Sequence, residues 1–192
     1  MEAATLLYFG MEKEYRQAKL KAAANIGAHV LPSNLEVALE LDKIAQETEG
    51  SRRSERLIQM RKEALTVMKA LANYCPVLIG SVWRGTIRRG SDIDIELFHD
   101  VPEEAVSALE ELGLKIQQTE QIITTERGKT GISFHIHGES IGKYPLEIIV
   151  RSEDEKGKKR KCDTFGDDIK GLTIQQLERL LNENSSQQFL PT

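Results

Sequence analysis

The spacing of apolar residues changes character near residue 75. From Ser54 onward, apolar residues recur three and four positions apart, which predicts an amphipathic helix that ends near Asn73. Two weaker helices are predicted over residues 2–28 and 34–48, the second closed by Gly50. The first 75 residues are therefore predicted to form a helical N-terminal extension.

After Pro76 the pattern becomes that of short strands. Residues 77–79 form a continuous apolar run, typical of a buried strand, and residues 91–98 alternate between acidic and apolar side chains. Because strand side chains alternate between faces, Asp92, Asp94 and Glu96 are expected to share one face of that strand.

Further elements are separated by glycine-containing turns. Strands are predicted over residues 114–125, 132–137 and 146–150, and helices over 102–112 and 174–181, the last with Thr173 as its N-cap. The pattern predicts an α+β (α/β) fold in which a small mixed β-sheet with packed helices follows the helical extension. We place the domains at residues 1–75 and 76–192.

Composition narrows the class of protein. The 192 residues include 26 Lys and Arg against 30 Asp and Glu, for a formal charge of −4. Such a balance disfavours non-specific nucleic-acid binding, which depends on excess positive charge. With only Cys75 and Cys162, a disulfide scaffold is not expected. No apolar run approaches the roughly 20 residues that span a bilayer, and no signal peptide is recognisable, so we expect a cytoplasmic protein with no membrane association.

The segment from Gly80 to Asp94 contains the most informative chemistry. Gly80-Ser81 follows a strand, and such a turn suits a phosphate because glycine allows close backbone approach and serine offers a hydroxyl. Asp92 and Asp94 lie about 7 Å apart along one strand face. Neighbouring carboxylates repel each other, and Mg²⁺ relieves that repulsion. An isolated Asp-Ile-Asp is usually part of a solvated strand face. Here it follows the Gly-Ser turn at a short separation, and this order favours a metal site.

These residues resemble the signature of the DNA polymerase beta-like nucleotidyltransferase superfamily, a Gly-Ser turn followed by a helix and an Asp-x-Asp strand. The likeness is to minimal nucleotidyltransferases and to the catalytic head of archaeal CCA-adding enzymes. It spans roughly residues 76–150, and the likeness to the CCA-adding enzymes continues past the motif into Leu97-Phe98 and Glu111-Leu112-Gly113-Leu114.

The resemblance implies a third carboxylate from a later strand, and Glu147 is the position that looks like it. Glutamate inside an apolar strand is costly unless it is paired or bound to a cation. The family usually has Asp there, so Glu147 is a departure from the pattern. By resemblance, Asp92, Asp94 and Glu147 would hold two Mg²⁺ ions, while Gly80 and Ser81 would bind the β- and γ-phosphates of a nucleoside triphosphate, with ATP the first candidate.

Arg84 matches a position of the minimal enzymes and would neutralise phosphate charge, whereas Arg88 and Arg89 are more typical of an exposed turn. Trp83 either stacks on a base or packs against the sheet. The basic run at residues 156–161 either follows an RNA backbone or forms a solvated loop.

Two histidines also share a strand face. His135 and His137 lie at i and i+2 and would suit zinc, but the sequence shows no third ligand, which favours ordinary strand histidines.

The leading interpretation is a Mg²⁺-dependent nucleotidyltransferase that transfers a nucleoside monophosphate to a hydroxyl of an RNA, protein or small-molecule acceptor and releases pyrophosphate. A second interpretation is the antitoxin of a toxin–antitoxin pair, a minimal nucleotidyltransferase that restrains a toxin partner by binding it or by modifying it with AMP. A third is a non-catalytic nucleotide-binding descendant, which the presence of Glu147 where the family usually has Asp would suit.

Overall fold

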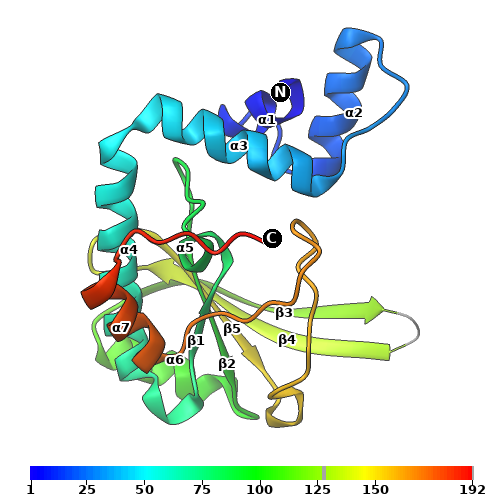
Figure 1. Cartoon of the computed structure of the whole chain (residues 1–192). Coiled ribbons are helices and arrows are strands. Elements are labelled where there is room, and N and C mark those ends of the chain that lie inside the picture. The colour runs from blue at the N-terminus through cyan, green and yellow to red at the C-terminus, as the bar shows by residue number, and fades with distance from the viewer. Residues whose placement is uncertain (127–128, 192) are drawn as a thin grey trace.

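The computed structural model describes residues 1–126 and 129–191 (Figure 1). Its helices are α1 (Glu2–Tyr8), α2 (Tyr15–Ile26), α3 (Asn34–Glu49), α4 (Ser51–Ala70), α5 (Gly80–Arg84), α6 (Pro102–Glu111) and α7 (Ile174–Glu183). Its strands are β1 (Val77–Ile79), β2 (Ile93–Phe98), β3 (Lys115–Glu126), β4 (Lys129–Glu139) and β5 (Pro145–Arg151). The described residues thus confirm the predicted α+β class.

The strands form a mixed sheet in the order β1-β2-β5-β4-β3. Strands β2 and β5 run parallel, and the other neighbouring pairs run antiparallel. Asp94 lies opposite Glu147 in the β2–β5 pair, and Glu147 lies opposite His137 in the β5–β4 pair. Because directly paired residues share a face, one row across three strands presents two carboxylates and an imidazole.

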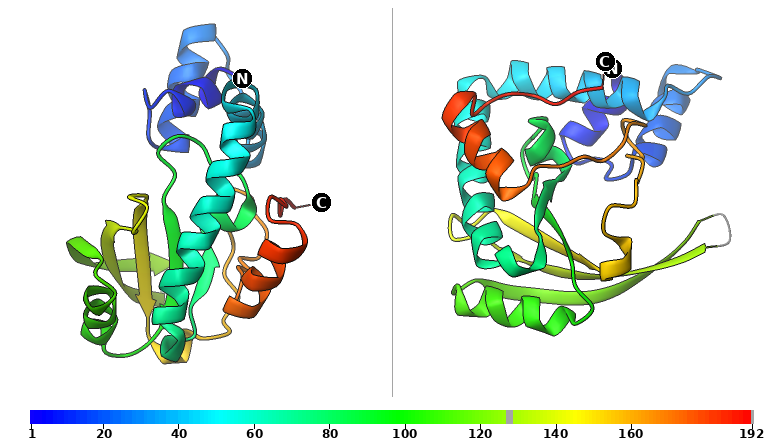
Figure 2. Two further views of the ribbon diagram at one scale, coloured as in Figure 1. Left: turned by 90° about the vertical axis from the view of Figure 1, so that its left-hand side faces the viewer. Right: turned by 60° about the horizontal axis from the view of Figure 1, so that its bottom comes forward.

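The other face of the sheet holds the main core. Ile93, Ile95 and Leu97 alternate with the acidic positions of β2 and are buried together with Leu57 and Met60 of α4. Helices α4 and α6 cover this face, and α7 packs against α4 (Figure 2). Helix α4 therefore shares its core with the sheet, although it precedes residue 75, and the domain division at that residue stays a prediction.

The first three helices form an arm with a separate small core (Figures 1 and 2). The prediction of one helix over residues 2–28 is wrong, because the chain forms α1 and α2 with a break between them. Gly10, in that break, has a φ of +69°, a left-handed conformation that cannot continue a helix, and Glu14 is extended before α2 begins. The predicted helix over residues 34–48 is confirmed by α3, which begins with a capping box between Ser33 and Glu36.

Charged side chains hold the arm against the loop that leads into β2. The Nε of buried Arg53 donates to the carbonyl of Ile87 at 2.7 Å, and its guanidinium pairs with Asp42 of α3. Glu49 accepts from the Tyr8 hydroxyl and from the backbone N–H of Arg89, each at 3.1 Å. The arm is therefore tied to the segment that contains the candidate site.

Arg61 connects α4 to α5 and to the C-terminal segment. It is fully buried and donates to the carbonyl oxygens of Val82, Trp83, Ser185 and Gln187 at 2.7–3.1 Å. Burial lowers the pKa of its guanidinium to about 10. Four backbone acceptors thus depend on one side chain.

We expect Arg61→Met to lower the free energy of unfolding by about 3 kcal/mol, because four carbonyls, including those of buried Val82 and Trp83, lose their donor. Urea denaturation followed by circular dichroism measures this. Arg52→Met, at an exposed position of the same helix, is the matched control and should change stability by less than about 0.5 kcal/mol. Equal stability of the two variants would contradict the role given to Arg61.

Candidate active site

The Gly-Ser turn lies where β1 ends and α5 begins. Gly80 has a φ of +68°, and a Cβ there would lie only 1.8 Å from Oδ2 of Asp94. Only glycine lets the backbone approach that carboxylate so closely. The Ser81 Oγ is buried and has no hydrogen-bond partner among the described residues. A buried hydroxyl without a partner is costly, so Ser81 is suited to a ligand that completes its hydrogen bonding.

Three carboxylates converge beside this turn. One ligand oxygen from each of Asp92, Asp94 and Glu147 lies within 4.8 Å of the others. Asp94 and Glu147 come from paired strands, whereas Asp92 lies one residue before β2, which begins at Ile93 rather than at the predicted Ser91. The fold therefore brings together the three acidic residues that the sequence analysis singled out.

The electrostatics of this cluster favour a bound cation. Burial raises the pKa of Asp94 well above its usual value, and the charges of Asp92 and Glu147 raise it further. Burial also raises the pKa of Asp92, with Glu147 adding to the effect and a backbone hydrogen bond and Arg88 opposing it. A divalent cation at the cluster would stabilise the ionised carboxylates. The cluster offers only oxygen atoms as ligands, which is the kind of donor set that Mg²⁺ prefers.

A cleft of about 260 Å³ opens over the turn and the two aspartates. One wall comes from the N-terminal arm, with Tyr15 of α2 and Leu41 and Asp42 of α3, and another from Cys162, Thr164 and Phe165. The sequence analysis did not predict these walls, because they join segments more than 35 residues apart in the chain. The arm thus borders the candidate site.

Arg84 is buried at the side of the cleft, and its guanidinium is already engaged. It pairs with Asp167, with its shortest contact at 2.6 Å, donates to the carbonyl of Phe189 and stacks on the rings of Trp83 and Phe165. Its expected role in binding phosphate stays a prediction. Asp167 is a partner that the sequence analysis missed, and no local signal could have revealed it.

The two following arginines differ in their surroundings. Arg88 is half-buried and lines the cleft, where its charge acts on Asp92, whereas Arg89 is exposed. Of the two, Arg88 is therefore the arginine that could contact an anion bound in the cleft.

Two other residues in and next to the signature, Trp83 and Glu96, make their contacts within the protein. Trp83 is buried in the main core, which supports packing rather than base stacking. Glu96 is buried and pairs with Arg151 at 2.7 Å and with Arg160. Its charge is therefore compensated away from the carboxylate cluster.

The basic run at residues 156–161 borders a separate pocket of about 630 Å³ beside β1. Several of its cations already have partners: Arg160 pairs with Glu96, Lys158 with Asp154, and Lys161 with Asp168 at 2.8 Å. These pairs, in which Lys158 and Lys161 stay exposed, support the interpretation as a solvated loop.

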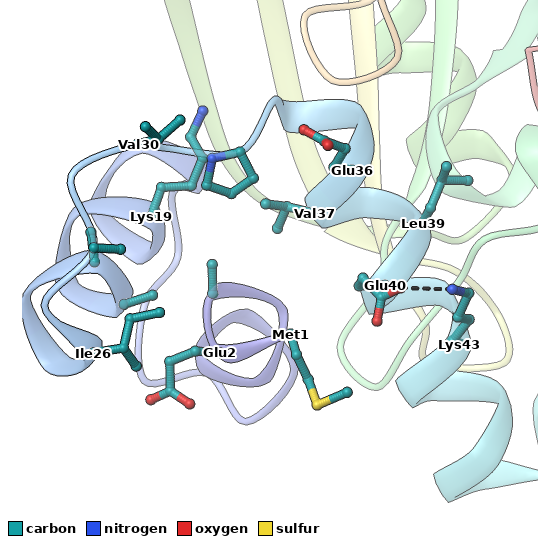
Figure 3. A pocket seen from close by; sticks show the side chains of 15 residues that line it. Met1, Glu2, Lys19, Ile26, Val30, Glu36, Val37, Leu39, Glu40 and Lys43 are labelled. Carbon is teal, nitrogen blue, oxygen red and sulfur yellow. Dashed lines mark hydrogen bonds and ion pairs between the residues drawn. The ribbon is translucent and has the colours of Figure 1, made fainter.

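A third pocket, of about 430 Å³, lies within the N-terminal arm (Figure 3). Its lining includes Ile26, Val30 and Val37, and Glu40 forms an ion pair with Lys43 at its edge at 2.6 Å. None of the predicted site residues lines it.

None of the helices described here combines the length and apolarity needed to cross a membrane.

Comparison with known proteins identifies the family to which this chain is similar. Residues 61–169 match the family model of the nucleotidyltransferase domain, which covers more than half of the chain. No curated protein matches the chain.

Two solved structures show weaker likenesses. A cytoplasmic RNA terminal U-transferase shares 16% identity at a TM-score of 0.34, over 58% of this chain and 34% of its own. The GLD-2/RNP-8 complex contains a chain with 11% identity at a TM-score of 0.36, over 64% of this chain and 38% of its own. This chain therefore spans just over a third of their length. On the family match, which confirms the resemblance seen in the sequence, the chain belongs to the nucleotidyltransferase domain family.

Proposed function

We propose that the protein is a Mg²⁺-dependent nucleotidyltransferase that moves a nucleoside monophosphate from a nucleoside triphosphate to a hydroxyl of an RNA, protein or small-molecule acceptor, with release of pyrophosphate. The observation that supports this most strongly is the convergence of Asp92, Asp94 and Glu147 within 4.8 Å beside the Gly-Ser turn. ATP is the first triphosphate to test.

The residues fit the metal that this chemistry needs. Asp92, Asp94 and Glu147 would hold two Mg²⁺ ions, and the raised pKa of Asp94 falls when a cation stabilises its ionised form. Bound Mg²⁺ polarises phosphoryl oxygens and lowers the pKa of an attacking hydroxyl. Ser81 would donate its unpartnered hydroxyl to the β- or γ-phosphate, and Arg88 would offset phosphate charge from the side of the cleft.

The metal-binding carboxylates also support one alternative. Glu147 stands where the resembling families usually have Asp, and its Oε1 lies 2.6 Å from Nδ1 of His135. A carboxylate held in this way suits a nucleotide-binding descendant that does not turn over.

Two labels on ATP separate these functions. The protein is incubated with Mg²⁺, pools of RNA, protein or small acceptors, and ATP labelled at either the α- or the γ-phosphate; the other triphosphates follow. We expect the α-label to appear in an acceptor and the γ-label to appear only in pyrophosphate. Tight Mg²⁺-dependent binding of ATP without transfer would support the non-catalytic alternative. Absence of both binding and transfer for every triphosphate would contradict the proposal.

A further inference from the structure

Three side chains on the open face of the sheet form a second cluster of metal-ligating type. His135 and His137 project from β4 on the same face, and His137 lies opposite Glu147 of β5. One donor atom from each of these three residues lies within 4.8 Å of the others, and His135 Nδ1 is 2.6 Å from Glu147 Oε1. The sequence showed two histidines without a third ligand, and the register of β4 and β5 supplies it.

The second ring nitrogens are held as in protein metal sites. The Nε2 of His135 lies 2.9 Å from the Ser133 hydroxyl, and the Nε2 of His137 lies 3.0 Å from Oε1 of Glu120. Histidine ligands usually bond through their other nitrogen to a carboxylate, a carbonyl or water, which fixes the tautomer and the ring orientation. The Glu120–His137 pair leaves Nδ1 of His137 as the nitrogen offered to a metal. These outer contacts orient both imidazoles.

The donor types distinguish this cluster from the carboxylate cluster beside it. Two imidazoles and a carboxylate are the protein ligands of many zinc sites, with a further position for water, whereas Mg²⁺ prefers oxygen ligands alone. We propose that His135, His137 and Glu147 bind a divalent transition-metal ion of the Zn²⁺ type. Glu147 then belongs to both clusters, and an ion on the histidine side would place a positive charge next to Asp92 and Asp94.

The side chains of the cluster are partly buried but remain accessible to an ion from solvent. The His135 side chain is 12% exposed, that of Glu147 22% and that of His137 34%. The imidazoles are thus shielded enough to be held in place, yet an ion can reach His137 from solvent. The proposal concerns binding alone and does not depend on nucleotide transfer.

Co²⁺ binding to the whole protein tests the proposal, because Co²⁺ occupies Zn²⁺ sites and absorbs visible light in a way that reports nitrogen ligands and low coordination number. Titrations with Co²⁺ are carried out in excess Mg²⁺, which competes for sites built from oxygen ligands alone. We expect one equivalent to bind with a strong visible band in the wild type and in Asp92→Asn/Asp94→Asn.

Loss of either imidazole should weaken Co²⁺ binding. We expect His135→Asn and His137→Gln each to weaken Co²⁺ binding by more than the roughly 10–100-fold that loss of an outer partner costs. His29→Gln, at an exposed position outside the cluster, is the matched control and should bind like the wild type. Circular dichroism checks that each variant is folded, and the more exposed His137 gives a test if His135→Asn does not fold. Co²⁺ binding that is unchanged in His137→Gln, or absent from the wild type, would overturn the proposal.

Discussion

Asp94→Asn is expected to lower the rate of nucleotide transfer by about a thousandfold or more, which corresponds to roughly 4 kcal/mol of transition-state stabilisation. Asp94 is the carboxylate nearest the Gly-Ser turn and faces Glu147 across the β2–β5 pair. The amide keeps the size of the side chain but loses the charge that a cation requires. Single-turnover transfer of the α-label at saturating Mg²⁺ measures the effect.

The same substitution should stabilise the protein when metal is absent. Burial and two neighbouring carboxylates raise the pKa of Asp94, so the folded state binds a proton more tightly than the unfolded state does. The stability of the metal-free protein therefore falls as the pH rises from the unfolded pKa toward the folded one. At pH 7 we expect Asn to add roughly 1 kcal/mol, or about 2–4 °C in Tm, and to add little at pH 3.

Magnesium should reverse this order. We expect Mg²⁺ with ATP to raise the Tm of the wild type and to leave that of Asp94→Asn nearly unchanged, because ligands stabilise only the state that binds them. Asp163→Asn, which replaces an exposed carboxylate, is the control and should behave like the wild type. An Asp94→Asn protein that transfers nucleotide at the wild-type rate would contradict the assignment of this residue.

Gly80→Ala is expected to lower transfer by about a hundredfold and to destabilise the fold. The backbone at φ +68° costs an L-residue roughly 1–2 kcal/mol. In addition, the new Cβ would lie 1.8 Å from Oδ2 of Asp94, so the carboxylate must move away from its position. A displacement of about 1 Å at a reacting group can cost this much in rate.

Gly27→Ala separates strain from displacement. Gly27 has the same φ of +68°, and nothing lies within 4 Å of a Cβ built there. We therefore expect it to lose a similar part of the stability but no activity. Comparable transfer by Gly80→Ala and Gly27→Ala would show that the close approach of the turn to Asp94 has no role in catalysis.

Local periodicity predicted most elements of this fold. The apolar repeat of α4, the alternation around Asp94 and the capping residue Thr173 each depend on neighbours along the chain, and the structure confirms α4, β2 and α7. The break between α1 and α2 was missed, because it depends on the left-handed Gly10 and on packing within the arm. A repeat of apolar positions does not detect such a break.

The candidate site was predictable only where its residues carry a local sequence pattern. Gly80 and Asp94 lie close in the sequence, and an acid within an apolar strand marked Glu147. The pairing of Arg84 with Asp167 joins residues 83 positions apart. Asp42 of α3, which lines the cleft, forms an ion pair with Arg53 of α4. The same holds for Glu147 beside His135, since the register of β4 and β5 decides it. Such contacts arise from tertiary packing and leave no local pattern.

The central claim is that the Gly-Ser turn and the three carboxylates hold a nucleoside triphosphate with Mg²⁺. A crystal structure of the wild type with Mg²⁺ and a non-hydrolysable ATP analogue tests it most directly. We expect metal at about 2.0–2.1 Å from oxygens of Asp92 and Asp94, and a β- or γ-phosphate oxygen within hydrogen-bond distance of the Ser81 Oγ. A triphosphate bound instead in the basic pocket beside β1 or in the pocket of the N-terminal arm, with no metal at the carboxylates, would contradict it.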